Sequence, residues 1–156
     1  MKNTLLLSTI VILLNSCSEV RRGGCIDPYA YNYESFADFD DGSCLYISDI
    51  VFYEDVAAAV YFDLQGVEWL DLSVNGEYIG TLDATLGLTY IPDCLEPDAI
   101  TFSLEWPNAN SSSFTWVIRD ETGYKWYEGV EAVIPNDCLP IGLTWKKIQE
   151  YNDATK

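Results

Sequence analysis

The sequence contains no histidine among its 156 residues, and it has only eight lysines and arginines against 25 aspartates and glutamates. Histidine is the usual acid–base group near neutral pH and a frequent zinc ligand. Its absence argues against most acid–base catalysis and, since no CxxC pair occurs, against a zinc site. A net charge of −17 leaves no basic patch for phosphate contacts. We therefore expect no catalysis and no nucleic-acid partner.

The sequence also lacks an apolar run long enough to span a membrane. Residues 5–14 form a ten-residue run, about half of the roughly 20 residues that a spanning helix needs. Because this run follows Met1-Lys2, it predicts a signal peptide over residues 1–16. Leu14-Asn15-Ser16-Cys17 resembles a bacterial lipobox, which implies that Cys17 carries a lipid after cleavage. The alternative is an ordinary signal peptide with Cys17 as a spare thiol.

Residues 17–24 are expected to form a tether, which Gly23-Gly24 makes flexible. Arg21-Arg22 would favour a negatively charged headgroup surface. Ser18-Glu19 places no aspartate at the second mature position, where it would suggest retention in the inner membrane. We therefore expect a lipid-anchored protein at the outer membrane or cell surface, with the membrane as its partner through the N-terminal lipid.

Four cysteines remain after Cys17, an even number that suits disulfides in an oxidising compartment. Three pairings are possible. We predict Cys25–Cys44 and Cys94–Cys138, because the first two bracket one compact motif and the others lie at the edges of the later domain. On the loop-entropy model the two rings would stabilise the fold by roughly 3 and 4 kcal/mol.

The compact motif is GCIDPYAYNYESFADFDDGSC, residues 24–44. It resembles the GCxDPxAxNYxxxAxxDDGSC repeat of surface proteins from Bacteroidota-type bacteria. The resemblance implies a surface lipoprotein in which the repeat, residues 25–44, precedes a small β-sandwich domain. The hairpin residues Val74, Gly76, Tyr78, Gly80 and Leu82 are similar to those of such domains. The aromatic residues of the motif are expected to cover its small core: Tyr29, Tyr31, Tyr33, Phe36 and Phe39.

Clustered carboxylates in this motif suggest calcium as one candidate ligand, since hard cations prefer carboxylate oxygens. The candidate ligands are Asp27, Asp38, Asp40 and Asp41. The register of an EF-hand does not fit, because with Gly42 at loop position six, Ala37 and Phe39 would occupy the first and third positions. The alternative needs no ligand, because Asp27-Pro28 and Asp41-Gly42 are ordinary turn formers. No other cofactor is expected.

Residues 45–145 alternate apolar and polar side chains with period two, which predicts an all-β domain, an antiparallel Ig-like β-sandwich preceded by the disulfide-closed motif. Asn75-Gly76 predicts a hairpin that pairs Leu72 with Ile79 and Ser73 with Tyr78. The other expected strands are 51–53, 59–64, 100–106, 114–118, 124–127 and 130–134. Residues 143–151 fit either a short helix or a last strand, and residues 146–156 are expected to form a C-terminal tail.

The excess of aromatic residues suggests a binding function, because exposed tryptophan or tyrosine can stack on sugar rings or hold a protein partner. The candidates are Trp69, Trp126 and Tyr127, although burial in the sheet would explain each of them as well. We expect a binding, adhesion or structural role at the surface, with a glycan or a surface protein as partner. The alternative is a small carbohydrate-active or accessory enzyme subunit that uses paired carboxylates.

Overall fold

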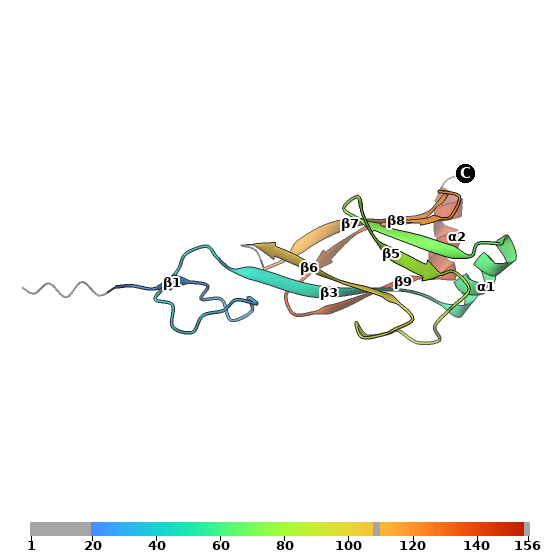
Figure 1. Ribbon diagram of the computed structural model, residues 1–156. Coiled ribbons are helices and arrows are strands. Elements are labelled where there is room, and N and C mark those ends of the chain that lie inside the picture. The colour runs from blue at the N-terminus through green and yellow to red at the C-terminus, as the bar shows by residue number, and fades with distance from the viewer. Residues whose placement is uncertain (1–19, 108–109, 155–156) are drawn as a thin grey trace, which may run out of the picture.

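The computed structural model describes residues 20–107 and 110–154. It is elongated, with a small disulfide-closed unit at one end, two β-sheets in the middle and both helices at the other end (Figure 1). The small unit contains the parallel two-residue strands β1 (Gly23–Gly24) and β2 (Phe39–Asp40). Asn32 connects the middle of the motif to its C-terminal end, because its side chain donates to the Ser43 carbonyl at 2.7 Å and accepts from the Leu45 amide at 2.8 Å.

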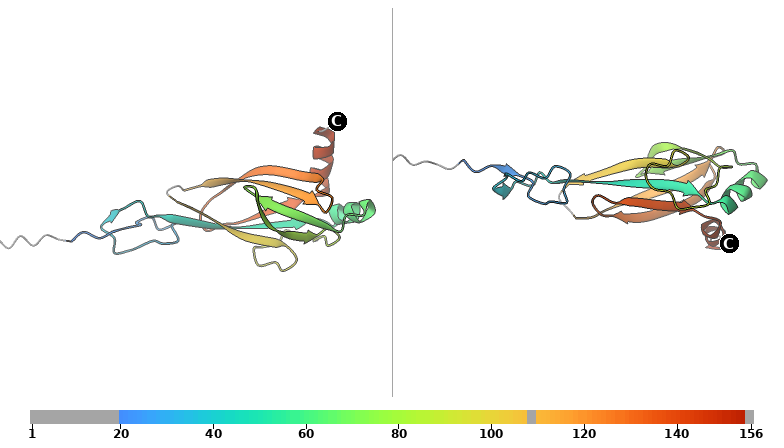
Figure 2. Two further views of the ribbon diagram at one scale, coloured as in Figure 1. Left: turned by 45° about the horizontal axis from the view of Figure 1, so that its top comes forward. Right: turned by 90° about the horizontal axis from the view of Figure 1, so that it is seen from below.

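The main domain consists of two sheets. One has the order β6–β3–β9, and the right-hand view of Figure 2 shows these strands side by side. The other has the order β5–β4–β7–β8. All pairs in these two sheets are antiparallel except β3–β9, which is parallel. The strands are β3 (Leu45–Glu54), β4 (Trp69–Val74), β5 (Glu77–Asp83), β6 (Ile100–Pro107), β7 (Ser112–Asp120), β8 (Lys125–Val133) and β9 (Cys138–Leu143).

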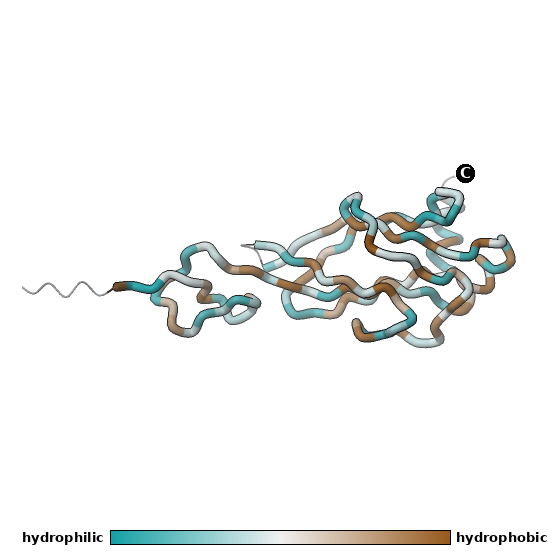
Figure 3. The backbone as a smooth tube through the Cα atoms, viewed as in Figure 1, coloured by the Kyte–Doolittle hydropathy of each residue, from teal (hydrophilic) through white to brown (hydrophobic). Residues whose placement is uncertain are grey.

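Aromatic side chains connect the two sheets in the core. Phe52 of β3 meets Trp116 of β7 edge to face at 5.4 Å between ring centroids, and Phe102 of β6 meets Phe114 of β7 at 5.9 Å. The period-two pattern explains these contacts, since alternate residues of β7 are buried and hydrophobic segments alternate with hydrophilic ones along the strands (Figure 3). The predicted mainly β fold is thereby confirmed.

The predicted hairpin at Asn75-Gly76 is present, with both residues at positive φ. Ser73 pairs with Tyr78 as expected. The expected pairing of Leu72 with Ile79 is wrong, because Leu72 pairs with Gly80. A bulge between Leu72 and Ser73 causes the difference, since it inserts one extra residue into β5 and shifts the register beyond it.

The strand expected over residues 59–64 is wrong. These residues belong to helix α1 (Val56–Gln65). The Asp55 side chain accepts from the Ala58 amide at 2.7 Å and caps the start of the helix, and Gly66 ends it in the left-handed conformation at φ 74°. Three consecutive alanines favour a helix, whereas the apolar run that follows fits a buried helix as well as a strand.

The C-terminal residues form helix α2 (Trp145–Ala154), which begins two residues after β9 ends at Leu143. Residues 146–154, expected as part of a tail, are therefore helical. Ile148 is buried and anchors the helix to the domain. The two short strands expected over 124–127 and 130–134 are one continuous strand, β8, which passes through Gly129. No helix in the described part of the chain is both long and apolar enough to cross a membrane.

Asp55 connects the two helices, and its replacement provides a test of this arrangement. Its carboxylate caps α1 and also accepts from the amide of Trp145, the first residue of α2, at 3.3 Å. We expect D55A to lower the free energy of unfolding by about 2 kcal/mol, since each lost cap costs on the order of 1 kcal/mol. D55N, which keeps an acceptor oxygen, should lose less than half of that in urea denaturation. Equal losses in both variants would contradict the double-cap role.

Candidate functional site

Both predicted disulfides are confirmed. Cys25–Cys44 closes the N-terminal unit, and Cys94–Cys138 joins the connection between β5 and β6 to the first residue of β9. Cys17, the predicted lipid attachment point, lies outside the described residues together with the predicted signal peptide. The predicted pairing therefore holds for all four cysteines that the structure describes.

The four candidate calcium ligands act as separate hydrogen-bond acceptors. The Asp27 carboxylate accepts from the Tyr46 hydroxyl at 2.6 Å, and this hydrogen bond lowers the pKa of Asp27. The others each accept a backbone amide: Asp38 from Arg22, Asp40 from Gly42 and Asp41 from Ser43. Within residues 20–107 and 110–154 no group of three acidic, cysteine or histidine side chains is placed to hold a metal ion. In these contacts Asp40 and Asp41 shape local turns, whereas Asp27 and Asp38 connect segments that are distant in the sequence.

Two of the three candidate ligand-binding aromatics are buried. Trp126 is 9% exposed, donates its indole N–H to Asp120 at 2.9 Å and packs edge to face against Phe62 of α1. Tyr127 is also buried, and its hydroxyl donates to the Thr144 carbonyl. The expectation that these two rings offer a stacking surface is wrong, because helix α1 and the strand–helix junction cover them. Trp69 is exposed at the start of β4, as its polar register predicts.

A pocket of about 290 Å³ lies between β8 and α2. This volume is just below the usual size range of small-molecule sites, about 300–1,000 Å³. Trp116 and Gly129 line it from the neighbouring strands β7 and β8, and Glu131 lines it further along β8. Lys147 and Glu150 of α2 form the opposite wall. The pocket therefore combines an aromatic ring with charged groups of both signs.

The indole nitrogen of Trp116 is a buried polar atom at this pocket. The residue is 3% exposed, yet its indole N–H has no hydrogen-bond partner within the described residues. A buried donor without a partner costs about 1–3 kcal/mol. Gly129 is paired with Trp116 across the two strands, and a Cβ at this position would lie 2.7 Å from the indole ring. The absence of a side chain at residue 129 thus makes room for the indole edge at the pocket.

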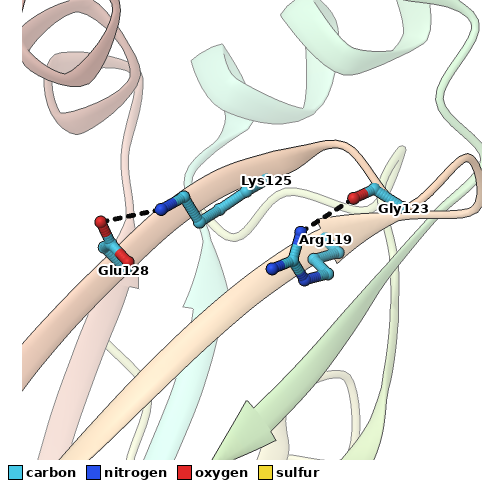
Figure 4. A network of polar contacts seen from close by, with 4 residues as sticks. All are labelled: Arg119, Gly123, Lys125 and Glu128. Atoms are coloured by element: carbon cyan, nitrogen blue, oxygen red, sulfur yellow. Dashed lines mark hydrogen bonds and ion pairs between the residues drawn. The ribbon is translucent and has the colours of Figure 1, made fainter. Parts of the chain in front are cut away.

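The charged groups around Trp116 are arranged in ordered pairs. The Lys147 ammonium lies 5.6 Å from the centroid of the Trp116 ring, a cation–π distance. Glu128, which also lines the pocket, pairs with Lys125 at 2.9 Å along β8 (Figure 4), and this contact raises the pKa of Lys125. Glu150 pairs with Lys146 at 3.7 Å. The pocket therefore holds both hydrogen-bond donors and carboxylate acceptors.

Most of this pocket was not predicted from the sequence. Trp116 fell within the expected strand 114–118, Gly129 fell between the expected strands 124–127 and 130–134, and Lys147 was not a candidate. Of the candidates from the sequence only Tyr127 lines the pocket, and that ring is buried. The available signal was Gly129 in the middle of a strand pattern, since an interior strand glycine often marks close approach of another group. Comparison of the chain with protein-family models, curated proteins and solved structures gives no match.

Proposed function

We propose that this protein is a lipid-anchored outer-membrane or cell-surface protein without catalytic activity, whose main domain binds a neutral saccharide in the pocket between β8 and α2. The observation that carries the proposal is the buried, unpartnered indole N–H of Trp116 beside Lys147 and the glutamates. Lipid attachment at Cys17 rests on the sequence pattern alone. The pocket is the location that we propose for the binding role.

The chemistry of the pocket favours a neutral ligand rich in hydroxyl groups. Sugar hydroxyls both donate and accept, and the pocket offers donors in Trp116 and Lys147 and acceptors in Glu131. Three glutamates against one lysine disfavour an anionic ligand. A cationic ligand is disfavoured because the Lys147 ammonium already occupies the cation–π position over Trp116. A neutral saccharide meets all of these conditions.

We also propose that the main domain is a β-sandwich that is Ig-like in layers and strand count only. The division into three and four strands equals that of constant-type Ig domains. The strand order differs, because the second, third, fifth and sixth strands of the domain share a sheet here. Constant-type Ig domains group the first, second, fourth and fifth strands. The parallel β3–β9 pair is a second difference from a purely antiparallel sandwich.

A glycoside hydrolase would need a proton-donating carboxylic acid at the pocket. Burial raises the pKa of Glu54 to about 9, but Glu54 is not among the residues that line this pocket. Glu128 and Glu150 do line it, and each is paired with its own lysine. These two observations favour binding over hydrolysis. Release of reducing ends from a bound oligosaccharide, abolished by E131Q, would favour the enzyme alternative instead.

The binding proposal predicts that neutral trisaccharides perturb the pocket. We expect cellotriose, xylotriose or mannotriose to shift the indole ¹⁵N–¹H resonance of Trp116, which is identified by its loss in W116F. Trigalacturonate should bind more weakly than the neutral sugars. K147M should weaken binding roughly tenfold, equivalent to about 1.4 kcal/mol for one lost hydrogen bond. Titration by NMR or calorimetry measures both effects.

K146M is the matched control, because Lys146 is the exposed neighbour of Lys147 on α2 and does not line the pocket. We expect less than a twofold change in affinity for it. The proposal is overturned if none of the neutral sugars moves the Trp116 resonance. It is also overturned if K146M and K147M weaken binding equally.

A further inference from the structure

The N-terminal unit exposes an unusual amount of aromatic surface. The sequence predicted that the aromatic residues of this unit cover a small core, but they are exposed to solvent. The exposed fractions are 43–81% for Tyr29, Tyr31, Tyr33, Phe36 and Phe39. Ile26 of the same unit is also exposed. A disulfide and backbone turns hold the unit together, so its side chains are free for another use. Soluble proteins rarely gather so many exposed aromatic residues without a binding role.

The position of this unit identifies what it contacts. It lies at the end of the molecule where the described part of the chain begins, opposite both helices (Figure 1). Cys25 follows Cys17 by eight residues, a length that spans at most about 28 Å even when fully extended. The aromatic residues are therefore confined to the immediate neighbourhood of whatever holds Cys17. No other part of the described molecule is constrained in this way.

We propose that the exposed aromatic side chains of residues 26–39 rest in the headgroup region of the membrane to which Cys17 is anchored. The inference rests on the proposed lipid anchor. Aromatic rings, tyrosine above all, suit this region because they have an apolar body and, in tyrosine, a polar hydroxyl.

The charges of the unit define which surface it fits. Arg21 and Arg22 are outnumbered by five acidic residues: Asp27, Glu34, Asp38, Asp40 and Asp41. Four of these carboxylates are satisfied by hydrogen bonds within the unit, as described above. A negative surface would repel the unit, whereas zwitterionic headgroups would not. We therefore expect the aromatic side chains of the unit to enter only the headgroup region, and to do so best in zwitterionic lipid.

Seating of this unit would also orient the saccharide pocket. Strand β3 starts one residue after Cys44 and runs without interruption into the three-stranded sheet. The Asn136 side chain, from the connection between β8 and β9, donates to the Tyr29 carbonyl at 2.9 Å. These two connections couple the orientation of the main domain to that of the N-terminal unit. The pocket beside α2 is then held away from the membrane, at the helix end of the molecule.

The test uses a tryptophan reporter in the unit, which has none of its own. The chain from Cys17 onward is coupled through this thiol to a maleimide-bearing phospholipid and incorporated into phosphatidylcholine vesicles. For the F36W protein we expect brominated phosphatidylcholine to quench the added emission at least twofold relative to ordinary lipid. Replacing Tyr29 and Tyr31 by serine in F36W should halve that quenching. Vesicles with negatively charged lipid should give less quenching than zwitterionic ones.

L64W is the matched control, because Leu64 is 76% exposed on α1 at the far end of the molecule. Its emission should not respond to brominated lipid. Equal emission of F36W in both lipids overturns the proposal, as does quenching that is unchanged by the two serines. If the unit stays in solution, a protein partner would be the alternative that covers its exposed aromatic residues. Mass spectrometry of the membrane-extracted native protein tests lipid attachment separately. The absence of a lipid on Cys17 can therefore be distinguished from the absence of contact between the aromatic residues and the headgroups.

Discussion

Replacing Glu54 by glutamine should remove a steep loss of stability with rising pH. Glu54 ends β3, is 2% exposed, and neither carboxylate oxygen has a hydrogen-bond partner within the described residues. Burial, together with the negative charges of Asp83 and Asp55, raises its pKa to about 9 from 4.5. Tyr127 of β8 also lies close, and burial together with Glu54 raises the pKa of Tyr127. The folded protein therefore holds a neutral Glu54 at pH 7.

The sign of the effect follows from proton binding. Between the unfolded pKa of 4.5 and the folded pKa of about 9, the folded state holds one more proton than the unfolded state, so the free energy of unfolding falls as pH rises. The slope is about 1.4 kcal/mol per pH unit, or roughly 4 kcal/mol from pH 5 to pH 8. E54Q cannot ionise. We expect it to match the wild type near pH 5 and to exceed it by that amount at pH 8.

Urea denaturation of both proteins at pH 5, 6.5 and 8 measures the difference, and the other carboxylates cancel because both chains share them. E77Q is the control, since Glu77 is an exposed glutamate at the start of β5. Its curve should run parallel to that of the wild type. Parallel curves for E54Q and the wild type would show that Glu54 ionises normally in the fold, and would contradict its burial as a neutral acid.

Replacing Asp120 by alanine should cost about 3–4 kcal/mol of stability at pH 7, because its carboxylate organises the turn between β7 and β8. It accepts from the Thr122 and Tyr124 amides, from the Thr122 hydroxyl and from the Trp126 indole at 2.6–2.9 Å. The turn also contains Gly123 at positive φ, whose carbonyl accepts from Arg119 (Figure 4). Hydrogen bonds to a charged group contribute about 1.5–3 kcal/mol each, and they are not additive within one network.

The stability from Asp120 should also depend on pH, in the opposite direction to that from Glu54. Burial opposes ionisation of Asp120, but the hydrogen bonds from Thr122, Trp126 and Tyr124 outweigh it and lower the pKa below 3.8. Its stabilisation is therefore present above the unfolded pKa of 3.8 and is lost as pH falls through the lower folded pKa. We expect the difference between wild type and D120A in urea denaturation to narrow as the pH falls below 3.8.

Two variants check this interpretation. D120N keeps one acceptor oxygen for the turn amides and should lose about half as much stability as D120A. E121A removes the neighbouring acid of the same turn, whose carboxylate accepts one long, exposed hydrogen bond from the Glu68 amide. It should change stability by less than about 0.5 kcal/mol. If E121A loses as much stability as D120A, the loss comes from removing any acidic residue of this turn and not from the hydrogen bonds of Asp120.

Local features of the sequence predicted much of the fold. The alternation around Phe114, Trp116 and Ile118 placed these residues on the buried face of β7, and Asn75-Gly76 placed the hairpin turn. The cysteine pairing followed from the position of each cysteine along the chain. These predictions hold because strand periodicity, turn conformation and short loop closure depend on neighbouring residues.

Other features could not be predicted from neighbouring residues. The segment at residues 59–64 became part of a helix whose face is buried, with Phe62 packed against Trp126 and Tyr127 of β8. Trp126 was a candidate for ligand contact until α1 covered it through Phe62. The shift of Leu72 to Gly80 depends on a bulge that both adjacent strands must accommodate. In each case the outcome depends on what packs against the segment.

By itself, the sequence determined that this is an acidic, mainly β chain with two disulfides, and it predicted the signal peptide and the lipid anchor. The tertiary structure alone decided where the pocket between β8 and α2 lies. Trp116, Gly129 and Lys147 come from β7, β8 and α2, and they meet only because β8 pairs with β7 and α2 folds back beside it. The physical reason is that a pocket is made by long-range packing, whereas the pattern along a chain encodes local conformation and burial.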